Sequence, residues 1–355
     1  MRKILVTLLP LGILILAARL FMRFPELVET VYSNWLYKVI LPPISRFAGI
    51  FPFSIAEVLI ILLLIWLVME IVNRLRSKSM DKPKKSRYSW LNLVVLIGLL
   101  YLGFLTLWGL NYHRPAFADM AGLDTRITTE EEVGKLAALL VNEANQLRAV
   151  VGEDEKGIMQ LGSSPREVLE QAVAGYAELS ELYPHLDGKY GSPKPLLLSR
   201  LISYSGIYGF YFPFTGEPNI NVAIPQVMLP VSTCHEMAHQ RGVAREEEAN
   251  LVAYLSAINN SSPEFKYSAT IFALSYVLND VAARDEKEFA ALRGSLVPEV
   301  IRDLEENRNF AKRHQGPWSQ VFSWINDAYL KANSQSEGVR SYSRVVDLLV
   351  ALIIR

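Results

Sequence analysis

Two histidines and a glutamate stand together in the stretch Cys234 to Asn250, CHEMAHQRGVAREEEAN. His235 and His239 are four residues apart, so on a helix they face the same side, where two imidazoles can bind one tetrahedral zinc ion. Glu236 projects on a neighbouring face, from which it can take a proton from an attacking water and pass it to a leaving amine. This His-Glu-x-x-His spacing is typical of metalloproteases and predicts zinc-dependent hydrolysis of an amide.

A catalytic zinc ion needs a third protein ligand and one open position. Gly242 follows the second histidine by three residues, where a helix can end in a left-handed cap and let the chain turn back. Glu246, Glu247 and Glu248 then come within reach of the metal. We predict Glu246 as the ligand, because it shares a helical face with Asn250, which can orient a histidine from behind the metal. Glu247 and Glu248 remain alternatives.

Hydrolysis also needs groups that hold the substrate and stabilise developing negative charge. The segment Leu196 to Pro225 is rich in aromatic and β-branched residues and contains three glycines, which predicts two or three short strands. A strand such as Pro218 to Ile224 is expected to pair with an extended peptide by edge addition. Four side chains are candidates for contacting substrate or the oxyanion: Tyr208, Tyr211, Arg340 and Tyr342. For the tyrosines, packing of the small sheet is the alternative.

The other histidines and the cysteine are interpreted as structural residues. His113, His185 and His314 have no partner at metal-ligand spacing. Cys234 points about 100° away from His235 on a helix, which favours a small buried residue over a ligand. Because it is the one cysteine of the sequence, a disulfide within the chain is impossible, and the cysteine count leaves the redox compartment open.

Three apolar runs precede the outer part of the chain: Ile4–Phe21, Ser54–Val72 and Trp90–Leu110. Each is close to the ~20 residues that cross a bilayer as a helix. The loop 73–89 carries seven basic residues and one acidic residue, which predicts a cytoplasmic loop. Three crossings then place residues 112–355 outside the cytoplasmic membrane. The first run could be a secretory signal, but the lack of a clean cleavage site favours an uncleaved helix.

The fold is therefore predicted to be membrane-anchored and mainly α. Residues 1–111 form the membrane region, with helices at about 4–21, 54–72 and 90–110, and residues 112–355 form a zincin-like α+β outer domain with a small sheet. In the outer domain, Thr128 or Thr129 caps a first helix, and further helices are expected over 165–182, 263–282, 285–312 and 317–331. Segment 22–53 is expected to be an outer loop along the membrane surface, with Trp35, Tyr37 and Phe47 at that surface.

The membrane region and the outer part of the chain differ in charge. The chain of 355 residues has a formal net charge of zero. Residues 1–88 hold 13 basic and 5 acidic side chains, which leaves 23 basic and 31 acidic side chains for the remainder. The outer part is mildly acidic, which argues against a nucleic acid as partner.

His235-Glu236-x-x-His239, followed by Glu246-x-x-Ala249-Asn250, resembles the gluzincin-type zinc peptidases. The whole chain looks like the family catalogued as "domain of unknown function 3810", bacterial membrane proteins with an N-terminal membrane segment and a metallopeptidase-like domain. This resemblance implies that His235, His239 and Glu246 bind zinc and that Glu236 is the general base. Many gluzincins place the glutamate further downstream, whereas this short spacing with an intervening glycine is closer to the metzincin layout.

Two functions are weighed. The first is a zinc-dependent peptidase or amide hydrolase, anchored in the lipid bilayer and acting on a peptide, a protein or a peptidoglycan peptide outside the cytoplasm. The second is a catalytically inactive or sensory metal-binding membrane protein. The presence of Glu236, which is no ligand, and an inner loop of about 17 residues, too short for an output domain, favour the enzyme. The sequence specifies neither the substrate nor the oligomeric state.

Overall fold

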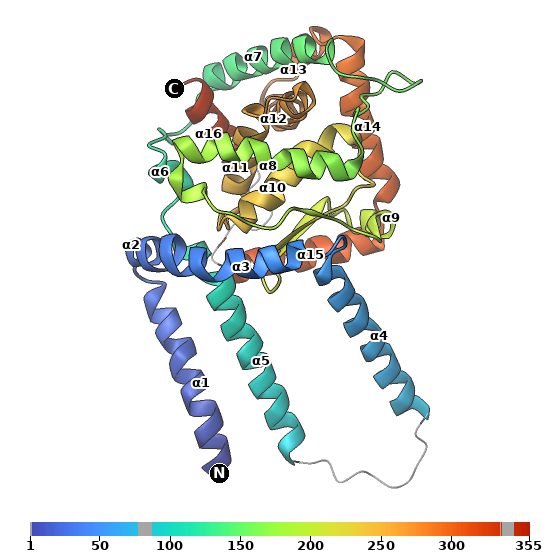
Figure 1. Ribbon diagram of the computed structural model, residues 1–355. Coiled ribbons are helices and arrows are strands. Elements are labelled where there is room, and N and C mark those ends of the chain that lie inside the picture. The colour runs from blue at the N-terminus through green and yellow to red at the C-terminus, as the bar shows by residue number, and fades with distance from the viewer. Residues whose placement is uncertain (1, 77–86, 334, 336–343) are drawn as a thin grey trace.

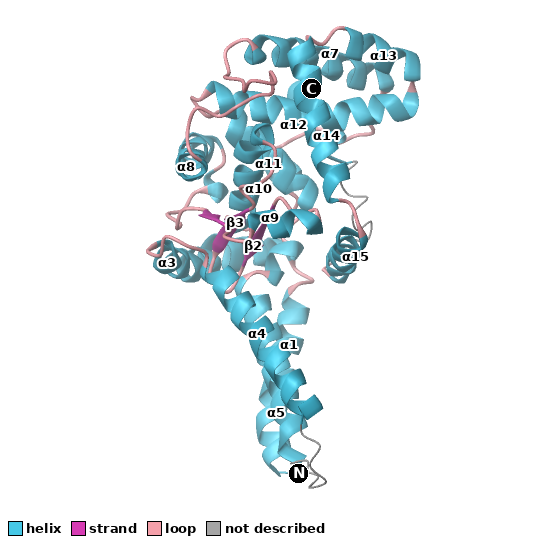
Figure 2. Cartoon of the chain, turned by 90° about the vertical axis from the view of Figure 1, so that its right-hand side faces the viewer, coloured by secondary structure: helices cyan, strands magenta, loops and turns pink. Residues whose placement is uncertain are grey.

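The computed structural model describes residues 2–76, 87–333, 335 and 344–355. It is mostly helical, with one small sheet of three strands (Figure 1). A helical body stands on three helices that leave it on the same side: α1 (Arg2–Phe21), α4 (Ile55–Arg76) and α5 (Arg87–Leu107) (Figures 1 and 2). Three apolar helices and a mainly helical body with a small sheet are thus both present.

Fewer helices qualify as membrane spans than the three predicted. Within the described residues, α4 qualifies by itself over Ile55–Asn73. α1 qualifies only together with the segment after it, as Leu8–Phe21 plus Pro25–Gly49, a pair bent by 107°. Within the described residues, α5 contributes the shorter apolar segment Asn92–Leu107, and the chain enters a 3-10 turn at Gly109 instead of continuing as a helix to residue 110. One or two helices are therefore long and apolar enough to cross a membrane.

Segment 22–53 is helical, although a loop was expected. It forms α2 (Pro25–Leu27), the π-helix η1 (Val28–Leu36) and α3 (Tyr37–Gly49). Trp35 and Phe47 are 62% and 63% exposed, in keeping with a surface position. The expectation for Tyr37 is wrong: its side chain is buried, and its hydroxyl donates to the carbonyl of Gln240 at 3.1 Å. Tyr37 therefore anchors α3 to the body and does not face the membrane surface.

The helices of the body begin at the caps that the sequence indicates. Thr129 and Ser164 each form a capping box with the glutamate three residues later, at the start of α7 (Glu130–Arg148) and α8 (Pro165–Leu182). Pro263 opens α12 (Pro263–Arg284). The remaining helical segments of the body up to residue 258 are η2 (Gly109–His113), α6 (Phe117–Met120), η3 (Pro184–Leu186), α9 (Ser199–Ile202), η4 (Ser203–Ser205), η5 (Gln226–Met228), α10 (Leu229–Gln240) and α11 (Glu246–Ile258).

The C-terminal part differs from the prediction at one point. The helix expected over 285–312 is divided into α13 (Glu286–Gly294) and α14 (Pro298–His314). The break is explained by Pro298, which lacks a backbone N–H and disfavours helical geometry in the residue before it. α15 (Pro317–Ala332) follows the predicted bounds closely, and the apolar tail forms α16 (Arg344–Ile353), whose apolar face is buried in the core.

The sheet consists of β1 (Lys194–Pro195), β2 (Gly209–Phe212) and β3 (Glu217–Ile220), in the order β1-β3-β2. β3 is parallel to β1 and antiparallel to β2. Both sides of β3 are therefore paired, so the stretch 218–224 offers no free edge at β3 for a peptide. Within the described part of the chain, β2 pairs on one side alone, and it packs against α10.

Two buried carboxylates fasten the start of α4 to this sheet. Glu217 of β3 accepts hydrogen bonds from the first two backbone N–H groups of α4, at 3.1 and 2.9 Å. Glu57 of α4 accepts hydrogen bonds from the backbone N–H groups of Leu197 and Leu198, both at 2.8 Å. Both carboxylates are nearly inaccessible to solvent. The helix that qualifies as a membrane span by itself is thus tied directly to the strand that packs beside the histidine helix.

Candidate metal centre

The two histidines lie on α10 and the acidic cluster opens α11, with a tight turn between them. Gly242 has φ +82°, and its backbone N–H donates to the carbonyl of His239 at 2.9 Å. The N–H of Val243 donates to the carbonyl of Ala238 at 3.1 Å. This pair of hydrogen bonds, with a glycine in the left-handed conformation, ends α10 in a Schellman motif. The turn brings Glu246, the first residue of α11, back over the histidines.

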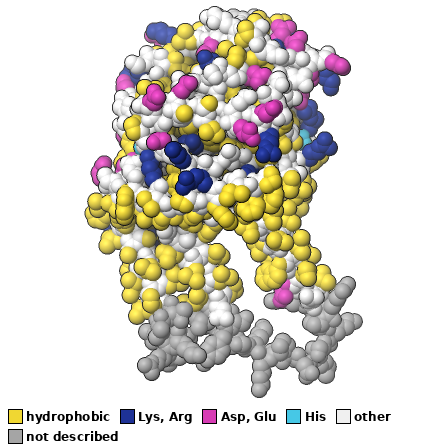
Figure 3. Space-filling model, viewed as in Figure 1, with side chains coloured by type: hydrophobic (Ala, Val, Ile, Leu, Met, Phe, Trp, Pro, Cys, Tyr) yellow, Lys and Arg dark blue, Asp and Glu magenta, His cyan; other side chains and the backbone are white. Residues whose placement is uncertain are grey.

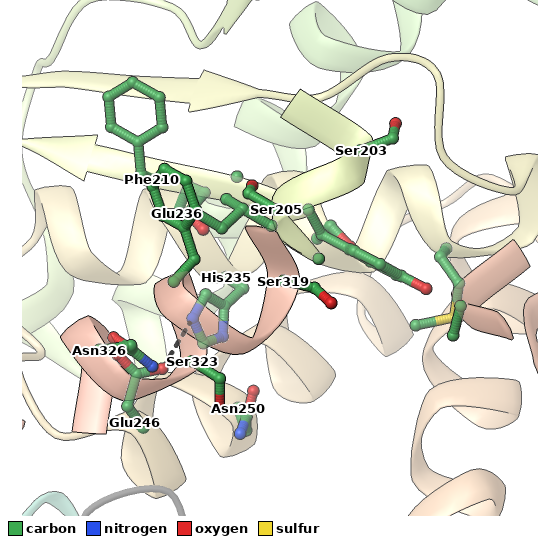
Figure 4. A pocket seen from close by; sticks show the side chains of 18 of the residues that line it. Ser203, Ser205, Phe210, His235, Glu236, Glu246, Asn250, Ser319, Ser323 and Asn326 are labelled. Carbon is green, nitrogen blue, oxygen red and sulfur yellow. Dashed lines mark ion pairs between the residues drawn. The ribbon is translucent and has the colours of Figure 1, made fainter. Parts of the chain in front are cut away.

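Three predicted ligands meet at this turn. The Nε2 atom of His235 lies 3.4 Å from Oε2 of Glu246, and Nε2 of His239 lies 3.6 Å from Oε1 of Glu246. One ligand atom from each residue lies within 4.8 Å of the other two. Ligand atoms at about 2.0–2.1 Å from a tetrahedral zinc ion are about 3.4 Å apart, and each histidine nitrogen lies at about that separation from a different oxygen of Glu246. Figure 4 shows His235 between Glu236 and Glu246.

Neighbouring groups surround both imidazoles, and a hydrogen bond orients that of His239. Nδ1 of His239 lies 2.7 Å from the carbonyl oxygen of Val243 and donates to it, which leaves Nε2 with a lone pair toward Glu246. The indole of Trp108 stands edge-on to the same ring, with centroids 5.7 Å apart. On the other side, Asn250 lies close enough to His235 to act to raise its pKa. Nδ2 of Asn250 has no hydrogen-bond partner among the described residues.

The neighbouring glutamates have other partners. Glu248 accepts a hydrogen bond from the backbone N–H of Phe117 and forms an ion pair with Arg245, both at 2.9 Å. Glu247 accepts a hydrogen bond from Gln335 at 3.4 Å. Since consecutive residues of a helix point in directions about 100° apart, one of the three carboxylates can face the histidines. Among the described residues, Glu246 is the one in the metal-competent group.

Glu236 is a buried carboxylate without a compensating charge. Its side chain lies beneath β2, where an added Cβ on Gly209 would lie 2.7 Å from its Cγ. Its Oε2 has no hydrogen-bond partner among the described residues. Burial raises the pKa of Glu236 to about 8, against a smaller lowering by His235. An unpaired buried carboxylate is costly to folding, and such groups are concentrated at functional sites.

The ligands themselves form a charge-coupled group. Burial acts to lower the pKa of His235, but the hydrogen bond and charge of Glu246 outweigh it, so that pKa is raised. Burial lowers the pKa of His239 to about 4. Burial acts to raise the pKa of Glu246, but the two histidines outweigh it and lower that pKa.

The group lies at the floor of a cavity of about 1950 Å³. β2 and η4 form one wall, α12 and α14 form a second, and α15 forms a third. Figure 4 shows Ser203, Ser205 and Phe210 on one side of the histidine, and Ser319, Ser323 and Asn326 of α15 on the other. The cavity is large enough to take several residues of an extended peptide, and its walls mix hydroxyl, amide and aromatic groups.

The other candidate residues are distributed as follows. Tyr208 lines the cavity, and its hydroxyl donates to Oδ1 of Asn307 at 2.8 Å. Tyr211 lines the cavity with its ring, while its hydroxyl lies 3.4 Å from that of buried Tyr37. Both hydroxyls are therefore already engaged. Arg340 and Tyr342 lie outside the described residues.

The remaining histidines and the cysteine are placed away from the ligand group. His113, His185 and His314 lie outside the three-residue metal group, and His314 donates from Nδ1 to the carbonyl of Phe310 at 2.9 Å. Cys234 is fully buried in the core.

Sequence reasoning missed three aromatic residues around the metal group. The hydroxyl of Tyr329, on α15, accepts hydrogen bonds from Nε1 of Trp108 and from the hydroxyl of Tyr112, both at 3.2 Å. Tyr112 and Tyr329 are close enough to Glu246 for its charge to raise the pKa of each, after the larger effect of burial. A hydroxyl has two lone pairs and one hydrogen, so Tyr329 keeps its own hydrogen for a further acceptor.

Comparison with known proteins gives a family. The family model described as "Protein of unknown function (DUF3810)" matches residues 32–350. The chain belongs to this family. The match extends from η1 through α16 and includes the two helices that hold the ligand group. No curated protein and no solved structure matches the chain. Membership in the DUF3810 family confirms the resemblance stated above at the level of the family, whose name carries no activity.

Proposed function

We propose that this DUF3810 protein is a membrane-anchored, zinc-dependent peptidase or amide hydrolase. The observation that carries the proposal is the meeting of His235, His239 and Glu246 beside the unpaired, buried carboxylate of Glu236. Two imidazole nitrogens and one carboxylate oxygen suit zinc, and such a set of three protein ligands is typical of catalytic rather than structural zinc. A bound zinc ion would polarise the substrate carbonyl and make a water molecule more acidic.

Glu236 supplies the proton transfer in this proposal. It follows His235 directly on α10, so its carboxylate lies beside the ligands without being one of them. It takes a proton from the water that attacks the amide carbonyl and delivers it to the leaving nitrogen. Its burial under Gly209 restricts its position and keeps bulk water away from it. A base held in this way needs little rearrangement in the transition state.

Tyr329 is the proposed donor to the oxyanion, in place of Tyr208 and Tyr211. Its hydroxyl receives two hydrogen bonds, from Trp108 and Tyr112, and its hydrogen is left to donate into the cavity beside Glu246. A donor fixed by two other groups stabilises developing charge without first having to be oriented. The free edge of β2, which lines the same cavity, is the proposed site for pairing with an extended peptide backbone.

The proposed location is the outer side of the cytoplasmic membrane. α1, α4 and α5 all leave the body in one direction, which suits three crossings with the body on one side (Figure 1). The basic residues of segment 73–89, which includes the far ends of α4 and α5, favour the cytoplasm. A reporter fused after Ser89 should be active only inside the cell and one after Tyr112 only outside. The reverse pattern would overturn this orientation.

The decisive experiment is metal analysis together with peptide hydrolysis on the full chain in lipid nanodiscs. Wild type should bind one zinc ion per chain and cleave members of a quenched-fluorescence peptide library. Glu246→Ala should lose most of the zinc, whereas Glu236→Gln should retain zinc and lose hydrolysis. Glu248→Ala is the matched control and should retain zinc, because Glu248 pairs with Arg245.

The other outcomes separate the alternatives. If wild type neither retains nor rebinds zinc, the metal site is wrong. If Glu248→Ala loses zinc and Glu246→Ala does not, the ligand assignment is wrong. Zinc binding by wild type without hydrolysis of any peptide favours the sensory or inactive protein over the enzyme.

A further inference from the structure

α15 has its polar side toward the protein. Ser319, Ser323 and Asn326 follow the spacing of one helical face, and all three line the cavity above the metal group (Figure 4). α15 is described over its whole length, and Leu330 is its one buried residue. A helix that covers the core of a water-soluble domain has the opposite arrangement, with its apolar stripe buried. The inner face of α15 is thus built to border a water-filled or substrate-filled space.

The apolar side of α15 points outward. Trp318 and Val321 lie on this outward side and are 69% and 46% exposed. Trp324 and Ile325 are 70% and 48% exposed and also line the cavity. Large apolar side chains gathered on one exposed face mark a contact with a partner or a membrane. An exposed tryptophan on such a face is typical of helices that lie in the interfacial layer of a bilayer.

The place of α15 in the fold identifies the bilayer as its partner. α15 and α3 lie on opposite sides of the body at the level from which α1, α4 and α5 descend (Figures 1 and 2). α3 also presents exposed apolar side chains there, among them Phe47. Figure 3 shows an apolar band at this level that continues onto the descending helices, with Lys and Arg side chains directly above it. Basic side chains at that height suit anionic lipid head groups.

The metal group lies close to the same level. Trp108 directly follows α5, and its indole contacts the ring of His239 and donates to Tyr329 of α15. One residue therefore joins the end of a membrane-anchor helix, a metal ligand and the outer wall of the cavity. The cavity therefore lies next to the C-terminal end of α5.

We propose that α15 lies in the head-group layer of the bilayer and forms the membrane-side wall of the cavity. The apolar outer face contacts lipid, and the polar inner face borders the substrate. It follows that the cavity receives peptide segments that are held at the bilayer surface by an acyl chain or a membrane-spanning anchor. The position of α15 is independent of catalysis, whereas the class of substrate rests on the proposed hydrolase function.

The position of α15 is tested with spin labels on the full chain in nanodiscs of phosphatidylcholine and phosphatidylglycerol. Labels at Trp318→Cys and Val321→Cys should be about tenfold more accessible to oxygen, relative to a water-soluble nickel chelate, than a label at the control position Leu139→Cys. Leu139 is equally apolar and 52% exposed, but lies on α7 at the far end of the body (Figure 1). Native Cys234 is fully buried and leaves little background. Equal accessibility at the three positions would overturn the membrane contact.

The class of substrate is tested with one quenched-fluorescence peptide, used with and without a palmitoyl chain, in the same nanodiscs. Wild type should cleave the acylated peptide with at least tenfold higher kcat/KM. In Trp318→Ser/Val321→Ser this preference should fall toward one, while zinc content stays unchanged. Equal rates for the two peptides, or a preference that the double variant retains, would overturn the tethered-substrate class. If neither peptide is cleaved, the hydrolase function fails, and the spin labels still decide the position of α15.

Discussion

Gly209 is the position at which a single methyl group should disturb the proposed base and leave the metal ligands in place. An added Cβ would lie 2.7 Å from Cγ of Glu236 and 2.9 Å from the carbonyl oxygen of Asn219. Ordinary van der Waals contact begins at 3.4 Å, so Glu236 must move by about 0.7 Å. Because a displacement of about 1 Å costs roughly 100-fold in rate, Gly209→Ala should lower kcat by about 10- to 100-fold, or about 1.4–2.7 kcal/mol.

The assay is hydrolysis of a quenched-fluorescence peptide by the full chain in nanodiscs, with zinc content measured on the same samples. Gly294→Ala is the matched control, since an added Cβ there meets nothing within 4 Å. Zinc content should stay at the wild-type level in both variants. In a Glu236→Gln background, Gly209→Ala should cost little more, because the group that it displaces no longer acts. Unchanged kcat in Gly209→Ala, or an equal further loss in the Glu236→Gln background, would refute the reasoning.

Three further predictions concern a hydroxyl, a thiol and an ion pair. Tyr329→Phe should lower kcat by roughly 100- to 1000-fold with zinc retained, as for loss of an oxyanion donor. An unchanged kcat would show that Tyr329 is not the donor to the oxyanion. Cys234 should react with a maleimide only after the fold opens, since it is fully buried. Free zinc at about 100 times its Kd should slow that reaction about 100-fold. Labelling at the same rate with and without zinc would contradict a zinc site in the native fold. Arg114→Met should cost about 3–5 kcal/mol of unfolding free energy in detergent, because it strands Glu29, its partner at 2.6 Å; Arg114→Met/Glu29→Met should recover part of that loss, and equal unfolding midpoints for all three proteins would contradict the pairing.

Structural features that depend on residues close together in the chain could be predicted from the sequence. The two histidines, the glycine that ends α10 and the opening of α11 lie within sixteen residues, from His235 to Asn250. Caps such as Thr129 and Ser164 are set by a residue three positions away, so both helix starts were predictable. The small sheet was predictable from its composition. These elements depend on local backbone preferences, which a single sequence displays.

Features that depend on distant contacts were not accessible. Trp108 and Tyr329 are separated by 221 positions, and nothing near either residue signals that they meet beside Glu246. The order of the strands placed β3 in the centre of the sheet, although its composition also suited an edge. Tyr37 looked like an interfacial aromatic, and only the docking of α3 on the end of α10 explains its burial. Tertiary packing decided each of these cases.

The hydrogen bonds of the Glu217 and Glu57 carboxylates bear on how far the ligand group lies from the start of α4. They tie the start of α4 to the sheet, and the sheet packs against the helix that holds the histidines. With α4 seated in a bilayer, these hydrogen bonds would hold the ligand group at a constant height above the lipid. For the proposed hydrolase, that height would set the number of residues between a substrate's membrane anchor and the bond that is cleaved. Spacing from the membrane, as well as side-chain identity, would then select the bond.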